Sequence, residues 1–248
     1  MTRFRAAGIH LLISLTIVIS ILTLMLGLWY PGMYFKLMGG GGLLFIMSGV
    51  DVCLGPLLTL CVFKAGKKSL KFDLTVIGLF QAAALSYGLY VMFEARPVFT
   101  VFTNDQFQVA SVVDIQPKEL SLAKNPEWRS FPLTGPVVVA ATAPTTQKDK
   151  DDVLAGALVG ADWQQFPRLY VSYDSQWQNI LAKAKPLSDL RAINKNNIPV
   201  VDSFLKSQAR PESDFAFLPI RTSQAEMAFV IDAHTGDQIK IIDVVPWR

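Results

Sequence analysis

The chain has 248 residues and a formal net charge of +3; 51% of its residues are hydrophobic and 17% are charged. The high apolar content excludes a disordered chain, and the ordinary numbers of Gly (16) and Pro (14) exclude a collagen-like one. Residues 1–93 contain 7 basic and 2 acidic residues, whereas the remaining 155 contain 16 and 18. This uneven distribution argues against a single soluble domain.

Three long apolar stretches in the N-terminal part are expected to cross a lipid bilayer as helices. They comprise residues 9–30, 43–63 and 74–93, and each has the length of about 20 residues that a membrane span needs. Arg3 and Arg5 before the first stretch resemble the start of a signal peptide. The apolar run is too long for one and lacks a small-residue cleavage pattern, so we expect it to stay as an anchor. Residues 1–93 are thus predicted to form a membrane domain with three transmembrane helices.

The positions of the basic residues predict how these spans are oriented. Arg3 and Arg5 precede the first span, and the loop between the second and third spans contains Lys64, Lys67, Lys68 and Lys71. The loop between the first and second spans contains only Lys36. Basic loops stay on the cytoplasmic side, so the N-terminus is predicted to be cytoplasmic and residues 94–248 to be exported. Trp29, Tyr30, Tyr34 and Phe35 are expected at the outer interface, among lipid headgroups.

Residues 94–248 are predicted to form a soluble α+β domain with an antiparallel sheet. This part has no Cys and is long enough to bury a core of its own. Alternating and β-branched runs predict one hairpin over residues 98–115 and another over 226–244, with a tight turn at 232–237. Further strands are expected at 136–141, 168–173 and 214–221, and short helices at 117–124, 146–158, 175–184, 188–193 and 200–208.

No pattern in the exported part indicates catalysis or metal binding. His234 is its only histidine and lies in the predicted turn, whereas a Ser-His-Asp site needs a supported histidine and zinc needs further His or Cys ligands. Asp232, His234 and Asp237 could chelate a metal, but we expect them to satisfy the backbone of their own turn. No carboxylate pair stands out, and no phosphate-binding glycine loop or nucleic-acid signature is present. We therefore expect no catalytic residue, no metal, no cofactor and no nucleic-acid partner.

Asp51 is the one charged residue inside a predicted span. A carboxylate at this depth faces a polar space between helices, binds a cation or stays protonated, because exposure to lipid is costly. Counting 1.5 Å per residue from the outer ends places Asp51 about 12 Å deep. The same count places the hydroxyl groups of Ser20, Thr23, Ser86 and Tyr87 near that level, and Gln81 deeper.

Two roles for Asp51 are open at this point. In the first, a protonated Asp51 bonds to neighbouring hydroxyl groups and holds the three helices together. In the second, Asp51 receives a polar or cationic group from a partner helix. Gly49 and Gly55 are small enough to let that helix approach, and Pro56 loosens the backbone hydrogen bonds around its position. A proton or solute pathway is not expected, because three spans with one acid contain no relay.

Several motifs occur together in and around the spans: Trp29-Tyr30-Pro31, Gly49-Val50-Asp51, residues 55–60 and 67–74, Gln81, Tyr87-Gly88 and Arg96-Pro97. In combination they resemble the type IV pilin accessory proteins of the TfpX/TfpZ family. The resemblance is strongest over about residues 5–110. In the exported part it is limited to the turn at 232–236 and to Pro246-Trp247, and the glycine run at 39–42 lies outside it.

The resemblance implies a non-enzymatic protein of the bacterial inner membrane that assists assembly, stability or surface display of a cognate type IV pilin. It places residues 94–248 in the periplasm and implies two partners, the pilin subunit and inner-membrane lipids. Asp51, Gly55 and Pro56 match the most distinctive membrane motif of the family and are the candidate partner-binding residues. A waiting pilin consists of an apolar helix and a periplasmic head, so the second span is expected to contact the helix and the exported domain the head.

Two other classes of function are weighed against this one. A periplasmic ligand-binding or sensor module is disfavoured because the predicted cytoplasmic segments are only about 8 and 10 residues long and leave no output domain. An envelope enzyme that modifies pilin is disfavoured because no catalytic group of residues stands out.

Overall fold

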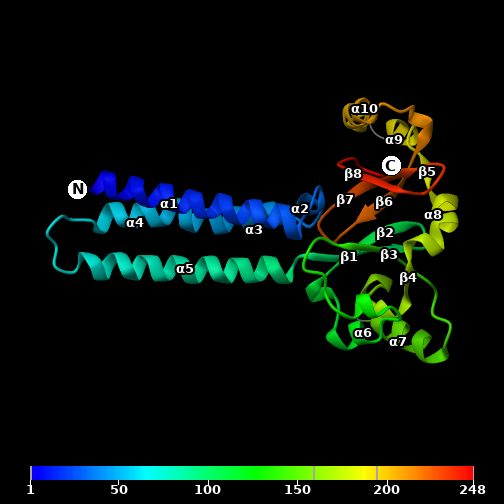
Figure 1. Ribbon diagram of the computed structural model, residues 1–248, viewed down its shortest axis with the longest axis horizontal. Coiled ribbons are helices and arrows are strands. Elements are labelled where there is room, and N and C mark those ends of the chain that lie inside the picture. Colours follow the sequence, from blue (N-terminus) through cyan, green and yellow to red (C-terminus); the bar gives the residue numbers. More distant parts are fainter. Residues whose placement is uncertain (1, 159, 194, 248) are drawn as a thin grey trace.

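The computed structural model describes residues 2–158, 160–193 and 195–247, and shows a bundle of long helices joined at one end to a sheet domain (Figure 1). The predicted order, apolar helices followed by a sheet domain with helices, is confirmed. The first stretch of the bundle is α1 (Arg3–Leu24) continued by a π-helical segment, η1 (Met25–Trp29). The second comprises α3 (Gly40–Ser48), the π-helical segment η2 (Gly49–Leu54) and α4 (Gly55–Val62), and the third is α5 (Leu70–Glu94).

All three stretches are long and apolar enough to cross a membrane, which makes them candidate spans at the predicted places. Each helix starts three to six residues before the apolar run that predicted it. Hydropathy marks only the part suited to lipid, whereas the helix continues through its polar flank because the backbone hydrogen bonds continue there.

The connection between the first two stretches packs into the sheet domain. It contains α2 (Tyr34–Leu37), and Leu37 is fully buried in a cluster with Phe102 and Phe107. The hydroxyl groups of Tyr34 and Thr100 form a hydrogen bond of 2.7 Å, and burial raises the pKa of Tyr34 to about 12. Tyr30 and Tyr34 were predicted to lie among lipid headgroups; they are only 1% and 9% exposed because they pack against protein instead.

The described residues of the sheet domain form an eight-stranded sheet in the order β4-β3-β1-β2-β6-β7-β8, with β5 also pairing with β6. The strands are β1 (Pro97–Thr103), β2 (Gln106–Ser111), β3 (Val137–Ala141), β4 (Tyr170–Ser172), β5 (Lys185–Pro186), β6 (Phe215–Arg221), β7 (Glu226–Asp232) and β8 (Gln238–Ile242). The predicted hairpins are confirmed as the antiparallel pairs β1–β2 and β7–β8.

The prediction of an antiparallel sheet is wrong, because the sheet is mixed. Strand β1 pairs with β3 in parallel, and β2 pairs with β6 in parallel. Parallel neighbours need a crossover connection that returns the chain to the same end of the sheet, and here the helical segments between the strands provide it. Local alternation predicts a strand and a short turn predicts a hairpin, but neither reveals which distant strand will lie alongside.

Helices cover the sheet and contribute to its core. In Figure 1, α6 and α7 lie on one side of the strands and α9 and α10 on the other. One buried cluster joins α6 to β1 and β3, and another joins α9 and α10 to β6, β7 and β8. The helices are α6 (Pro117–Ser121), α7 (Gln147–Leu158), α8 (Trp177–Lys183), α9 (Asp189–Ile193) and α10 (Asn197–Gln208), with 3₁₀ turns η3 (Val112–Asp114), η4 (Pro126–Arg129), η5 (Trp163–Gln165), η6 (Pro167–Leu169), η7 (Tyr173–Gln176) and η8 (Glu212–Asp214).

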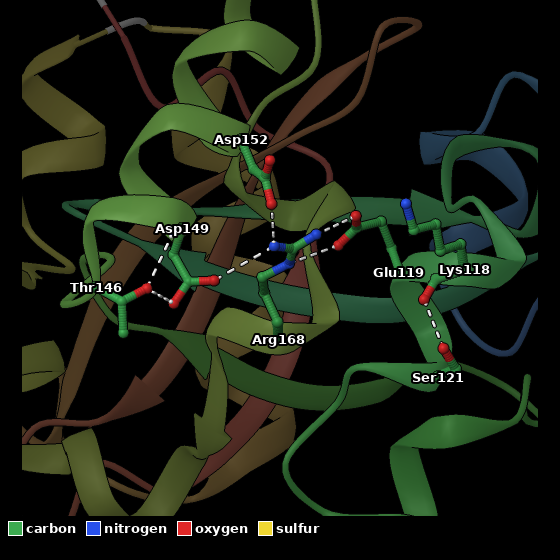
Figure 2. A network of polar contacts seen from close by, with 7 residues as sticks. All are labelled: Lys118, Glu119, Ser121, Thr146, Asp149, Asp152 and Arg168. Atoms are coloured by element: carbon green, nitrogen blue, oxygen red, sulfur yellow. Dashed lines mark hydrogen bonds and ion pairs between the residues drawn. The ribbon is translucent and has the colours of Figure 1, made fainter.

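Arg168 attaches α6 and α7 to the sheet domain through three carboxylates (Figure 2). Its side chain is only 9% exposed and binds both carboxylate oxygens of Glu119, with 2.8 Å between Arg168 Nε and Glu119 Oε2. Its Nη1 lies 2.5 Å from Asp152 Oδ2 and 3.3 Å from Asp149 Oδ1. These hydrogen bonds, led by those to Glu119, raise the pKa of Arg168 above its ordinary value, so the guanidinium stays charged.

The turn between β7 and β8 satisfies its own polar groups, as predicted. Asp232 Oδ1 accepts hydrogen bonds from the backbone N–H groups of His234 (2.8 Å) and Thr235 (3.0 Å). Asp232 Oδ2 accepts one from Arg210 at 2.7 Å, and Gly236 adopts a positive φ of 78° that completes the turn. Burial would raise the pKa of Asp232, but these hydrogen bonds and the Arg210 charge lower it from 3.8 to about 2.

Replacing Arg168 by Met is expected to destabilise the protein by about 3 kcal/mol, because the Glu119 carboxylate, which is only 14% exposed, loses its counter-charge. Denaturant unfolding of the full chain in detergent measures the loss. Arg191→Met is the matched control: Arg191 also binds two carboxylates, those of Asp202 and Glu212, but its side chain is 30% exposed. The control should cost no more than about 1 kcal/mol. Equal losses would contradict a special role for the Arg168 network.

Replacing Asp232 by Asn is expected to lower stability at pH 7 by about 2 kcal/mol, the value of hydrogen bonds to a charged group. Because the folded pKa lies below the ordinary one, this contribution is present above about pH 4 and disappears as the pH falls towards 2. Thermal unfolding across a pH series, with exposed Asp105→Asn as control, measures it. A difference between wild type and Asp232→Asn that is constant at all pH values would attribute the effect to packing rather than charge.

Candidate functional site

Asp51 lies inside the helix bundle, in the π-helical segment η2, and is only 6% exposed. Its contact with another helix comes from Gln81 of α5, whose Nε2 lies 3.4 Å from Asp51 Oδ1. The same nitrogen lies 3.4 Å from the backbone oxygen of Asp51. One amide group therefore serves both the side chain and the main chain of Asp51.

Pro56 explains why the backbone oxygen of Asp51 is free to accept this bond. In η2 the backbone hydrogen bonds run from residue i+5 to residue i, as shown by the bond from Gly55 N–H to Val50 O. The next bond in this pattern would run from residue 56 to Asp51 O, but proline has no N–H. The Gln81 side chain replaces the missing donor.

Gly55 makes the close approach of Gln81 possible. A Cβ atom placed on Gly55 would lie 2.1 Å from Gln81 Nε2, which is well inside van der Waals contact. Gly55 and Pro56 are both buried at this point of the bundle. Asp51, Gly55, Pro56 and Gln81 thus form one unit, which we call the Asp51 cluster.

The hydroxyl groups that were predicted to surround Asp51 point elsewhere. Ser20 and Thr23 donate to the carbonyls of Thr16 and Ile19 in their own helix, each at 2.8 Å. Ser86 and Tyr87 of α5 are exposed on the outside of the bundle. Gln81, which the depth count placed deeper than Asp51, is the side chain that reaches it.

A second polar contact lies in the same bundle, nearer the N-terminal end of α1. His10 Nδ1 and Thr59 Oγ1 are 2.6 Å apart, and Thr59 is almost completely buried. Asp51, Gly55 and Thr59 are spaced four residues apart, so they share the face of the second stretch that packs against its neighbours. The polar groups of this stretch therefore face α1 and α5, and its opposite face is apolar.

The described part of the sheet domain shows no metal site. Within residues 2–158, 160–193 and 195–247, no group of three or more His, Cys, Asp or Glu side chains is placed to hold a metal ion. Asp232 is engaged by its own turn and by Arg210, and the two cysteines, Cys53 and Cys61, are exposed on the helix bundle.

Comparison with known proteins relates this chain to fimbrial assembly. A model of the family described as "Fimbrial assembly protein FimB" matches residues 1–39. The serogroup I fimbrial assembly protein of Dichelobacter nodosus is 35% identical over 231 residues, which cover 92% of this chain and 89% of that protein. The serogroup E1 protein of the same organism is 35% identical over 233 residues, with the same two coverages. No solved structure matches the chain.

A third relative, the fimbrial assembly protein of serogroups C1 and C2, is 40% identical over 121 residues, 48% of this chain and 92% of that protein. The matches with the first two relatives extend through both the helix bundle and the sheet domain. They do not bear on the narrower TfpX/TfpZ resemblance. The chain belongs to the FimB family of fimbrial assembly proteins.

Proposed function

We propose that this protein is a membrane-anchored accessory factor in the assembly of a type IV pilus, and that it acts by contacting the pilin subunit without catalysis. The observation that carries the proposal is the relationship over 92% of the chain to proteins named for fimbrial assembly. A shared role in pilus assembly follows from that relationship; contact with pilin is the physical step that we add.

The arrangement of the bundle supports anchoring in the inner membrane with the sheet domain in the periplasm. The N-terminus and the loop between α4 and α5 lie at the end of the bundle away from the sheet domain (Figure 1). That loop region contains Lys64, Lys67, Lys68 and Lys71, all exposed. Basic loops remain in the cytoplasm, so this charge favours export of the sheet domain.

The Asp51 cluster is better suited to holding the helices than to receiving a partner. Asp51, Gly55 and Pro56 are all buried, and Gln81 occupies the position from which a partner group would bind. A direct contact of these three residues with pilin stays a prediction. We place the contact instead on the apolar outer face of the second stretch, where Leu54, Leu57 and Leu58 are 52%, 56% and 47% exposed.

Deletion of the gene is expected to abolish or strongly reduce surface pili, and expression of the full chain should restore them. Surface pili and total cellular pilin are measured separately, so that lost assembly is distinguished from lost pilin. Co-purification of pilin with the full chain tests the contact, and polar replacements at Leu54 and Leu57 should weaken it. Normal amounts of both pili and pilin after deletion would refute the proposal.

Replacing Gly55 by Ala is expected to move the Gln81 amide away from Asp51 and to destabilise the bundle by about 1 kcal/mol, as found for hydrogen bonds between membrane helices. Gly49→Ala, at the start of η2 in the same helical stretch, is the matched control, because a Cβ there meets no atom within 4 Å. Unfolding in mixed micelles measures both variants. If Gly55→Ala costs as much in a Gln81→Ala background as in wild type, the two residues are not coupled and the Asp51 cluster is not a unit.

A further inference from the structure

A hollow of about 560 Å³ lies where the helix bundle meets the sheet domain. Met38 and Ala95, beside the ends of the helices, form part of its wall, and Gln108 of β2 and Arg221 of β6 form another part. Further parts of the wall come from residues 109–114, the segment around residues 160–165 and the turn at 222–224. Its size falls within the range of small-molecule sites.

Two buried amide oxygens beside this hollow have no hydrogen-bond partner among the described residues. They are Oε1 of Gln108, a residue that is only 7% exposed, and Oε1 of Gln164; both side chains line the hollow. Gln108 cannot resolve this by turning its amide, because its Nε2 already donates to Asp162 Oδ2 at 2.8 Å. Buried acceptors without a donor are rare in folded proteins, so these two oxygens call for a donor from outside the chain.

The charged and polar groups around the hollow indicate which charged groups its ligand has. Asp114 and Asp162 line it together with the unpaired amide oxygens, so this side offers acceptors and negative charge and calls for an ammonium group. Arg221 lies beside Gln108 in the parallel register of β2 and β6. Its exposed side chain makes no ion pair or hydrogen bond within residues 2–158, 160–193 and 195–247, which leaves it free to bind a phosphate.

The position of the hollow identifies the source of such a ligand. Ala95 directly follows α5, and Met38 precedes α3, so the hollow opens at the outer ends of the candidate spans. In an inserted protein this is the level of the phospholipid headgroups. Among the described residues that line the hollow there is no aromatic side chain, which disfavours a stacked sugar ring.

We propose that this hollow binds the phosphoethanolamine headgroup of a membrane phospholipid. The ammonium group donates to Gln108, Gln164 and the neighbouring carboxylates, and the phosphate pairs with Arg221. The inference rests on the membrane anchoring proposed above. The bound headgroup then attaches the sheet domain to the bilayer, in addition to the anchoring by the helices.

The test is a lipid titration of the purified full chain, read by native mass spectrometry. Phosphatidylethanolamine is expected to bind about tenfold more tightly than phosphatidylglycerol, since one hydrogen bond to a charged group is worth roughly that factor. Arg221→Gln and Gln164→Met should each weaken phosphatidylethanolamine binding by about tenfold. Lys206→Gln, which removes one exposed charge from α10, is the matched control and should change nothing.

A competition experiment with a soluble ligand distinguishes a lipid headgroup from a free molecule of the same chemistry. Free O-phosphoethanolamine should displace the bound lipid from the wild-type protein. The same competition with the Arg221→Gln variant should show no displacement. Equal binding of both lipids, or variants that match Lys206→Gln, would overturn the inference while leaving the pilus experiments untouched. Binding of O-phosphoethanolamine by a chain that does not insert into membranes would assign the hollow to a free ligand, and would refute the lipid source and the anchoring together.

Discussion

Inside a bundle of apolar helices every polar group must find its partner within the protein, and the rest of this bundle is arranged around that constraint. Pro56 removes one donor from the second stretch, and the π-helical segment before it leaves the Asp51 carbonyl without its backbone partner. Gln81 supplies the replacement and satisfies the Asp51 carboxylate with the same amide, and the missing side chain of Gly55 gives it room. One hydrogen-bonding group thereby sets how the second and third helices face each other.

Direct contacts join the helix bundle to the sheet domain. The Tyr30 hydroxyl donates to Met92 O at 2.7 Å and joins the first stretch to α5, while Thr222 of the sheet domain donates to Leu37 O at 2.6 Å. Leu37 itself is part of the core beneath the sheet. The helices and the sheet domain are therefore joined by packed side chains and hydrogen bonds, in addition to the chain itself. For the accessory role proposed above, this connection would fix the spacing between a contact on the helices and a contact on the sheet domain.

Charge takes a different part in each half of the molecule. In the sheet domain, arginines collect carboxylates from separate elements: Arg168 joins α6 and α7, and Arg210 joins η8 to the turn after β7. These ties stabilise a domain that has no cysteines. In the bundle, the Asp51 carboxylate accepts a hydrogen bond from the Gln81 amide instead of pairing with a cation. An amide satisfies the carboxylate without burying a second charge. Arg221 forms no such ion pair in the described part of the chain, and it lines the hollow discussed above.

Patterns along the chain were sufficient to predict the three apolar helices, both hairpins and the self-satisfied turn at Asp232, since each depends on neighbours a few residues apart. They also singled out Asp51, Gly55 and Pro56, because a charge, a glycine and a proline are unusual in one apolar run. Gln81 carried a comparable signal as the lone amide of the third run, but its pairing with Asp51 depends on how two helices slide past each other. The parallel strand pairs, the burial of Tyr34 and the hollow beside Gln108 likewise arise only when distant segments pack together. Periodicity encodes which face of an element is apolar, and tertiary packing decides what that face will meet.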